Sequence, residues 1–232
     1  VPYLKDRFRL GTGIIKAKVL RTAGIGESLL DNEIGTELLE MANPTIGLAA
    51  HAGQVDVRIT AKAEDVSTAD QMIQVVEAQI RARVGKFIFG VDQEEIETVL
   101  GQLLQSNGLK VAVSETGVAN LLSERIKKTS NSQQVLAVAT SYANPNTLQA
   151  ELGISGDLPI RELAEKAANL LVNGTNANAG IAIVSHPDMD EQHADSEAGT
   201  AIAVYYANVI RSRVYGFGGQ GDTAPLWAST WA

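Results

Sequence analysis

Apolar and polar residues follow two different patterns along the chain, and the change between them divides it in two. In the first part, short alternating runs predict strands over 14–20, 45–50, 55–61 and 86–89, and recurrence every three or four residues predicts helices over 28–41 and 68–84. Within 55–61 every second residue is apolar, so one sheet face is buried and the other is wet. The order β-α-β-β-α-β, a KH-like topology, is that of a small two-layer α+β sandwich.

Polar and glycine-containing segments predict where these elements begin and end. Ser67 stands where an N-cap is expected for the second helix, and Gly85 is placed to end it. Asn43-Pro44 stops the first helix, which Gly35 weakens. The segment 51–54 is a short turn between two β-rich runs and predicts a hairpin.

The second part alternates helices and strands. Helical spacing covers 94–106, 117–127 and 161–173 and returns over 224–232, while apolar runs predict strands over 109–113, 135–140, 180–184 and 200–206. This order predicts a three-layer α/β domain with a mostly parallel sheet, whose ligands bind at the carboxyl ends of the strands. We therefore predict two domains, an α+β module over 1–91 and an α/β domain over 92–232.

Composition restricts the chemistry that is available. The chain of 232 residues has no cysteine and three histidines, which excludes disulfides, thiolate zinc sites and cysteine nucleophiles. No apolar run is long enough to cross a membrane, and residues 1–6 lack the apolar region of a signal peptide, so we expect a cytoplasmic protein with no membrane partner.

The net charge of −8 argues against recognition of a nucleic-acid backbone. The basic clusters Lys5-Arg7-Arg9 and Arg81-Arg83-Lys86 are short and read as solvated faces. The turn Gly24-Ile25-Gly26-Glu27 is loosely similar to the Gly-x-x-Gly of nucleic-acid-binding KH modules, but its spacing differs and a glutamate stands where phosphate would bind. A nucleic-acid-binding module therefore stays an alternative, and we expect no nucleic-acid partner.

Residues 109–126 carry a recognisable pattern, LKVAVSETGVANLLSERI. It resembles the signature of the CinA C-terminal amidase family, in which a strand ends in Ala-Glu-Ser-Cys-Thr-Gly-Gly before a helix. Further similarities keep this register without gaps, at 140–144, 152–154 and 198–200. Upstream, RTAGIGESLL and NPTIGLAAHAGQVDVRITA resemble the middle module of full-length CinA proteins, which follows a pyrophosphatase domain.

The resemblance implies a site for hydrolysis of the carboxamide of nicotinamide mononucleotide. The family's serine and lysine fall on Thr116 and Thr147, and Glu115 could act as acid or base. We expect the remaining positions of the motifs to bind ligand: Gly117, Ser132, Tyr142, Asn144, Ser185, Gly199, Thr200 and Asp222.

The expected amine is missing from this register, and threonine at 223 replaces the arginine of a phosphate clamp. The family's Thr-Gly-Gly is replaced by the bulkier segment 118–120. We therefore interpret the chain as a CinA-like fragment with an amidase fold and a degenerate catalytic site. It would serve as a scaffold, dimerisation or nucleotide-sensing domain in pyridine-nucleotide recycling, with a homodimer and a pyridine nucleotide as expected partners and no cofactor.

An active hydrolase with a rewired or metal-assisted site is the alternative enzyme. His186 and His193 stand among four carboxylates in one loop and, with Glu115, could hold zinc or manganese. We favour the interpretation of the same loop as an exposed acidic segment of an acidic protein, and we assign no metal site to it. The glycine-rich stretch 215–221 lacks the Lys-Ser/Thr of a P-loop and is interpreted as a loop before the last helix.

Overall fold

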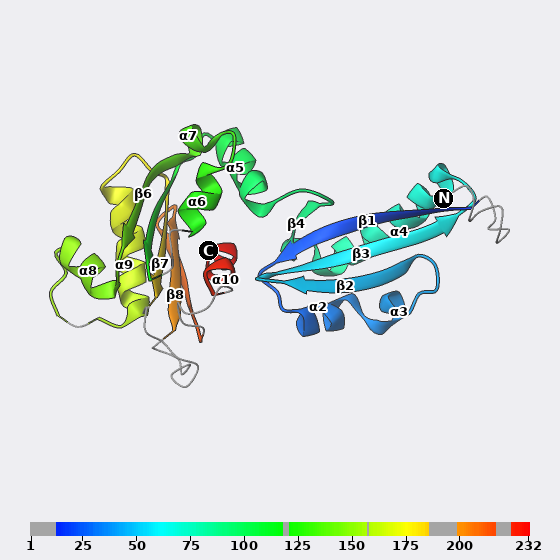
Figure 1. Ribbon diagram of the computed structural model, residues 1–232, viewed down its shortest axis with the longest axis horizontal. Helices are drawn as coiled ribbons and strands as arrows, with labels where there is room; N and C mark the ends of the chain where they lie inside the picture. Colours follow the sequence, from blue (N-terminus) through cyan, green and yellow to red (C-terminus); the bar gives the residue numbers. More distant parts are fainter. Residues whose placement is uncertain (1–12, 118–120, 157, 186–198, 217–223) are drawn as a thin grey trace, which may run out of the picture. The chain divides into compact units, whose positions relative to one another are not determined.

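The computed structural model describes residues 13–117, 121–156, 158–185, 199–216 and 224–232. The chain divides into two compact units, Val1–Glu94 and Glu95–Ala232. Each unit contains one sheet with its own helices (Figure 1).

The first unit is a four-stranded antiparallel sheet of order β2-β3-β1-β4 with helices packed against one face. Its elements are β1 (Ile14–Ala23), α2 (Glu27–Ile34), α3 (Thr36–Leu39), β2 (Thr45–His51), β3 (Gln54–Ala63), α4 (Val66–Val84), the 3₁₀ turn η1 (Gly85–Phe87) and β4 (Ile88–Val91). The predicted order β-α-β-β-α-β is confirmed.

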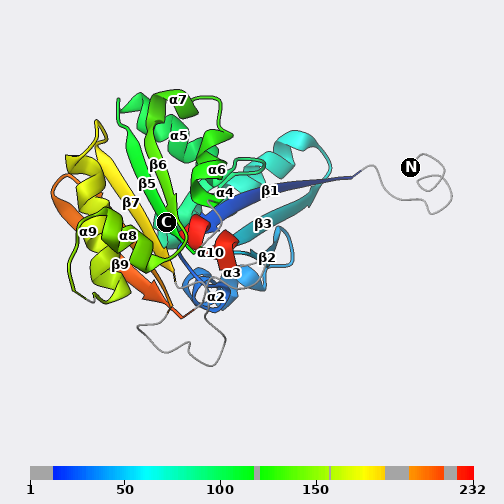
Figure 2. The same ribbon diagram turned by 60° about the vertical axis from the view of Figure 1, so that its left-hand side comes forward.

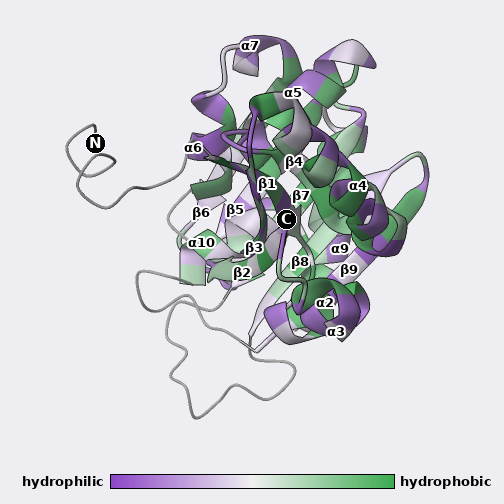
Figure 3. Ribbon diagram, turned by 90° about the vertical axis from the view of Figure 1, so that its right-hand side faces the viewer, coloured by the Kyte–Doolittle hydropathy of each residue, from purple (hydrophilic) through white to green (hydrophobic). Residues whose placement is uncertain are grey.

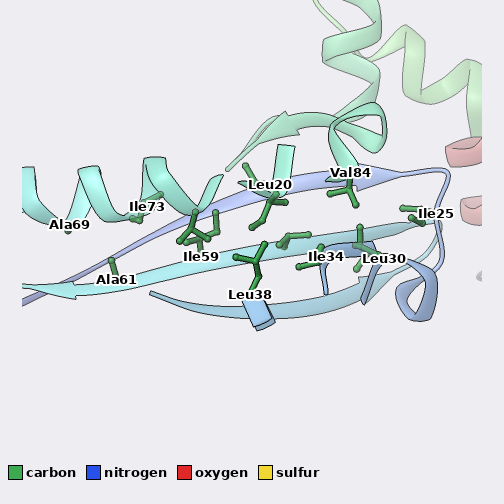
Figure 4. Packing of buried hydrophobic residues seen from close by; sticks show 14 residues of the cluster. Leu20, Ile25, Leu30, Ile34, Leu38, Ile59, Ala61, Ala69, Ile73 and Val84 are labelled. Atoms are coloured by element: carbon green, nitrogen blue, oxygen red, sulfur yellow. The ribbon is translucent and has the colours of Figure 1, made fainter. Parts of the chain in front are cut away.

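Alternation along the strands builds the core of this unit. Leu20 of β1, Ile59 of β3 and Val84 of α4 are fully buried, and Figure 4 shows these side chains between the sheet and the helix. At the border of the core, Lys18 Nζ of β1 lies 2.6 Å from Glu77 Oε2 of α4. The predicted wet face of 55–61 is confirmed, because its polar residues alternate with buried ones.

Two predicted helix details are wrong in this unit. The helix expected over 28–41 breaks at Gly35, whose φ of 86° no helix accommodates, and Arg83 braces the break through the carbonyl of Ile34. The N-cap of α4 is Asp65, whose Oδ1 accepts the N–H of Thr68 at 2.9 Å. Ser67 lies inside the first turn because the helix begins earlier than its apolar stripe indicates.

The second unit is a five-stranded sheet of order β6-β5-β7-β8-β9. Its elements are α5 (Ile96–Ser106), β5 (Val111–Thr116), α6 (Leu121–Lys127), α7 (Ser132–Val135), β6 (Leu136–Tyr142), α8 (Pro145–Glu151), α9 (Ile160–Asn173), β7 (Ala179–Ser185), β8 (Thr200–Tyr206), β9 (Val209–Tyr215) and α10 (Ala224–Trp231). Strands β6, β5 and β7 are parallel, and an antiparallel hairpin of β8 and β9 completes the sheet.

Helices cover both faces of this sheet, which confirms the three-layer α/β architecture (Figure 2). Residues of α5, α6 and α10 pack on one face, and those of α8 and α9 pack on the other. The α9 layer is close to the sheet, since a Cβ added to Gly180 of β7 would lie 2.1 Å from the carbonyl oxygen of Ala168. Small side chains therefore set the spacing of these two layers.

The sequence prediction misses β9, α7 and α8. The turn before β9 consists of Ala207 and Asn208, with φ values of 50° and 63°, and alanine is a weak signal for such a turn. Helix α8 begins with Asn144 as N-cap and Pro145 at its first position, a start signal that the pattern of apolar residues does not contain.

A polar network and an aromatic cluster hold the last helix to the second unit. Arg125 of α6 donates to Glu97 of α5 and to the hydroxyls of Ser229 and Thr230 on α10. The ring of Trp231 lies 4.5 Å from that of Tyr215 on β9, measured between centroids. Helix α10 is thus joined to both a helix and a strand.

Hydrophilic and hydrophobic residues are mixed along helices such as α2, α3 and α4 (Figure 3). In the described ranges, no helix combines the length and the apolar character that crossing a bilayer requires.

Candidate functional site

The carboxyl ends of the parallel strands in the second unit bring several predicted site residues to one edge of the sheet. Thr116 ends β5 beside Tyr142 of β6 and Val184 of β7 in the strand register. Ser185 ends β7 and pairs with Thr200, the first residue of antiparallel β8. This edge is the one at which open α/β sheets bind their ligands.

The Thr116 hydroxyl forms its hydrogen bonds within the sheet. It donates to the carbonyl oxygen of Ser185 at 3.2 Å and accepts the N–H of Ser185 at 3.0 Å, and the whole residue is buried. Both hydrogen bonds join neighbouring strands beyond the last register pair. The hydroxyl expected to attack a substrate therefore closes the end of the β5–β7 ladder.

Two glycines bring main chain close together at this edge. Gly117 has a φ of 66°, and a Cβ there would lie 2.5 Å from the carbonyl oxygen of Ser185. Gly199 is still tighter, because an added Cβ would lie 1.8 Å from the carbonyl oxygen of Tyr215. Neither position can take a side chain without moving backbone.

Glu115 lies on the opposite face of the sheet from Thr116, since neighbouring strand residues alternate. Its carboxylate accepts the N–H of Leu122 at 2.9 Å, the N–H of Ser123 at 3.1 Å and the hydroxyl of Ser123 at 2.5 Å. It is fully buried against the start of α6. Two main-chain donors that could hold an anion at this helix end, those of Leu122 and Ser123, are thus occupied by the chain's own carboxylate.

The side chains of Ser185 and Thr200 are hydrogen-bonded to each other. Thr200 Oγ1 donates to Ser185 Oγ at 2.8 Å, and both residues are buried. The pair joins β7 and β8 directly across the edge of the sheet.

Thr147 lies in the first turn of α8 and has a capping role. Asn144 Oδ1 accepts both the N–H of Thr147 at 2.9 Å and its hydroxyl at 3.1 Å. The Thr147 side chain is exposed, while Tyr142 packs beside the cluster formed by α8 and α9. The position expected to supply a base therefore donates to the helix cap that Asn144 provides.

Ser132 lies away from these residues. It begins α7, which directly precedes β6, so it lies at the amino end of a strand whose carboxyl end carries Tyr142. The seven residues of β6 separate the two ends by roughly 20 Å. The structure thus does not bring Ser132 to the edge that carries Thr116.

Several predicted residues lie outside the described residues: Asp222, the segment 118–120, and the loop histidines His186 and His193. Among the residues that the structure describes, no group of three or more potential ligands could hold a metal ion. Glu115, the carboxylate proposed for the metal-assisted alternative, is committed to α6.

No lysine ammonium contacts the Thr116 hydroxyl within the part of the chain that is described, where its hydrogen-bond partners are both on Ser185. Lys127 lies at the far end of α6, with its Nζ 3.1 Å from Glu124 Oε1. The amine that would activate a nucleophilic threonine is absent from the described neighbourhood of Thr116.

The sequence reasoning missed two buried hydroxyls beside this edge. Ser123 supports the Glu115 carboxylate, whereas Ser114 Oγ is buried without a hydrogen-bond partner in the described ranges. The strand extends beyond its predicted end at residue 113, and a strand drawn to Thr116 would have placed Ser114 on the same face as Thr116.

Comparison with known proteins gives the family. Residues 17–90 match the family model of the damage-inducible protein CinA KH domain. The chain belongs to the CinA family. A CinA-like protein of Kosmotoga olearia is 30% identical over 186 residues, which cover 79% of this chain and 44% of that protein. A CinA-like protein of Dictyoglomus turgidum is 38% identical over 126 residues, or 54% of this chain and 30% of that protein.

A solved structure shares the CinA fold. The crystal structure of a CinA superfamily protein from Escherichia coli has a TM-score of 0.51 at 17% identity, and it covers 59% of this chain and 83% of that chain. The chain spans less than half the length of the curated CinA relatives it matches.

Proposed function

We propose that the second unit is an amidase-fold module of a CinA-like protein that binds a pyridine nucleotide without hydrolysing it. The observation that carries this proposal is the pair of hydrogen bonds between the Thr116 hydroxyl and the main chain of Ser185. A hydroxyl that holds two strands together is not free to attack a carboxamide. The lack of a positioned base among the described neighbours of Thr116 would lower the rate further, by about 10² to 10⁴.

Two other contacts support the same proposal. Glu115 occupies the N–H groups of Leu122 and Ser123 at the start of α6, so these two are not available to stabilise an oxyanion. Thr147 is bonded to Asn144 as part of a helix cap. Each residue expected to take part in catalysis has a structural partner instead.

Ammonia release from nicotinamide mononucleotide tests the missing hydrolysis. We expect no release above the rate of buffer alone, and no change in Thr116→Val or Thr116→Ser. Release that Thr116→Val abolishes and Thr116→Ser retains would show that the hydroxyl is a nucleophile, and the proposal would fail.

Ligand binding is tested separately by thermal unfolding with nicotinamide mononucleotide, ribose 5-phosphate and nicotinamide. A ligand that binds only the folded state raises its stability, by about 2.7 kcal/mol at a concentration of 100 times Kd. We expect the complete nucleotide to give the largest shift and Tyr142→Phe to reduce it, with the ligand-free midpoint unchanged. An identical shift in the wild type and the variant would remove Tyr142 from the site.

We further propose that the module forms a homodimer through the free edge of β6. Among the described strands β6 is an outer strand, and it contains no charged residue and no proline, the features that usually keep edge strands apart. Antiparallel pairing centred on Ala139 would place Val138 opposite Thr140, without like charges.

Sedimentation of Ser141→Glu, which adds a carboxylate at this edge, tests the dimer. The matched variant Gln102→Glu adds the same charge on exposed α5. We expect the first to be monomeric and the second to behave as the wild type. Equal masses for the two variants would exclude β6 as the interface.

A further inference from the structure

Strand β9 forms the other edge of the five-stranded sheet, and no described strand pairs with its outer side (Figure 2). It is joined to β8 by a two-residue turn, with pairs running from Tyr206 and Val209 to Thr200 and Tyr215. Because antiparallel pairs alternate between hydrogen-bonded and non-bonded, every second residue of β9 turns its N–H and C=O away from β8. A row of main-chain donors and acceptors therefore follows the outer side of β9.

A groove follows the same strand on its α9 side. It has one section of 560 Å³ and one of 440 Å³, which follow one another along α9 and β9. Ile210, Ser212, Arg213 and Val214 contribute the strand side of the groove. A chain added beside β9 would thus have room for every second side chain next to α9.

Apolar side chains gather at the hairpin end of the groove. Ile210 is 38% exposed, although it is large and apolar, whereas the exposed Tyr206 and Val209 lie on the opposite face of the hairpin. Leu170 of α9 is also exposed and lines the section that contains Ile210. Exposed apolar groups gathered in this way mark interaction surfaces.

The opposite side of β9 is basic. Arg211 and Arg213 both project there, since they alternate with Ser212, and Arg211 has no ion-pair partner among the described residues. Cations outnumber carboxylates along β9 and the facing side of α9: Arg161, Lys166, Arg211 and Arg213 against Glu162 and Glu165. On a chain of net charge −8 this is a local excess of positive charge.

This charge pattern argues against a second copy at β9. Antiparallel self-pairing centred on Ser212 would place Arg211 opposite Arg213 twice, and like charges in that position are destabilising. Uncharged β6 carries no such penalty. The two edges of the sheet therefore suit different partners.

We propose that the free edge of β9 binds an extended acidic segment of a partner protein as an added strand. Main-chain hydrogen bonds to β9 would supply affinity, and the side chains would supply specificity. Carboxylates at every second position pair with Arg211 and Arg213, while the β-branched residues between them pack beside Ile210 and Val214. In the partner segment, acidic and β-branched residues thus alternate with a period of two residues.

Binding of two synthetic peptides of equal composition tests this period. One is Thr-Glu-Val-Glu-Val-Glu-Val-Glu-Thr, and the other gathers the same residues in blocks as Thr-Val-Val-Val-Glu-Glu-Glu-Glu-Thr. By fluorescence anisotropy we expect the alternating peptide to bind at least ten times more tightly and to weaken with salt. It should also slow amide exchange at alternate residues of β9. Equal affinity for the two peptides, or exchange unchanged along β9, overturns the proposal.

Charge reversal locates the site. Arg211→Glu with Arg213→Glu should weaken binding at least tenfold, and the matched control Arg58→Glu with Lys62→Glu makes the same change of charge on exposed positions of β3. Because Arg213 lies over the ring of Tyr215, Arg211→Glu alone serves as a second variant if the double one unfolds. Unaltered affinity in the Arg211 variants, or equal loss in the β3 control, contradicts the assignment.

Discussion

Arg125 Nη2 of α6 donates to Glu97 Oε2 of α5 at 2.9 Å, and the two side chains are only 13% and 19% exposed. The same guanidinium donates to Ser229 and Thr230 of α10. One arginine therefore joins three helices on one face of the sheet, which makes the pair a sensitive point of the second unit.

Loss of this arginine should release α10 and destabilise the unit. Arg125→Ala leaves the largely buried Glu97 without its counter-charge, and we expect a cost of about 2–4 kcal/mol in the free energy of unfolding. Both tryptophans of the chain, Trp227 and Trp231, lie in α10, so intrinsic fluorescence reports on this helix. Lys127→Ala, at an exposed ion pair of α6, is the control and should cost about 0.5 kcal/mol or less. Unchanged tryptophan emission in Arg125→Ala would contradict the bracing role.

The same ion pair predicts a dependence of stability on pH. Burial raises the pKa of Glu97, but the hydrogen bond and charge of Arg125 outweigh it and hold the pKa below the ordinary 4.5. The folded state thus binds the proton less readily than the unfolded state. The stabilisation is complete above about pH 4.5 and is lost as pH falls through the lowered pKa.

Urea unfolding of the wild type and Glu97→Gln between pH 7 and pH 3 measures this contribution. We expect the variant to be less stable by about 1 kcal/mol at pH 7 and the difference to shrink below the ordinary glutamate pKa. A difference that stays constant over the whole range would show that Glu97 does not titrate with folding.

The break between α2 and α3 should not tolerate a side chain. Gly35 has a φ of 86°, and an added Cβ would lie 2.7 Å from Arg83 Nη1. Gly35→Ala should therefore cost about 2–3 kcal/mol, through backbone strain and displacement of the arginine. Gly47→Ala is the matched control, because nothing lies within 4 Å of its added Cβ and its φ is not positive. Equal thermal midpoints for the two variants would disprove the strain argument.

Two serines beside the same strand should respond in opposite directions. Ser114 Oγ is buried without a partner in the described ranges, so Ser114→Ala should raise the free energy of unfolding by about 1 kcal/mol. Ser123→Ala removes a hydroxyl that donates to buried Glu115 and should lower it by about 1–3 kcal/mol. Calorimetry of the two variants gives the sign of each change in the free energy of unfolding. Destabilisation by Ser114→Ala would indicate a partner for its hydroxyl.

Much of the fold follows from local pattern. Alternation in 55–61 identifies β3 because one of its faces packs on a core and the other does not. The sequence predicts the second unit less well where tertiary contacts determine the backbone conformation. An example is the turn of Ala207 and Asn208, which both have a positive φ. Alanine rarely signals such a turn, and β9 is therefore missed.

The sequence predicts where the candidate site residues lie, but not which hydrogen bonds they form. The strand pattern correctly leads to the carboxyl edge of the sheet, where Thr116 and Ser185 meet. Because the predicted strand ends at residue 113, it does not place Glu115 and Thr116 on opposite faces, and it gives no sign that Asn144 engages Thr147. The hydrogen bonds of these side chains depend on which partner is nearest in space. An ungapped alignment of motifs carries no such information.

The close approach at Gly199 has a consequence for how this family can diversify. Gly199, the residue before β8, lies directly against the carbonyl of Tyr215, with no room for one more carbon atom. The separation of the main chain at this point is therefore set by peptide groups. Substitutions around it can exchange charge, polarity or hydroxyls, but a wider separation would require the hairpin of β8 and β9 to be rebuilt.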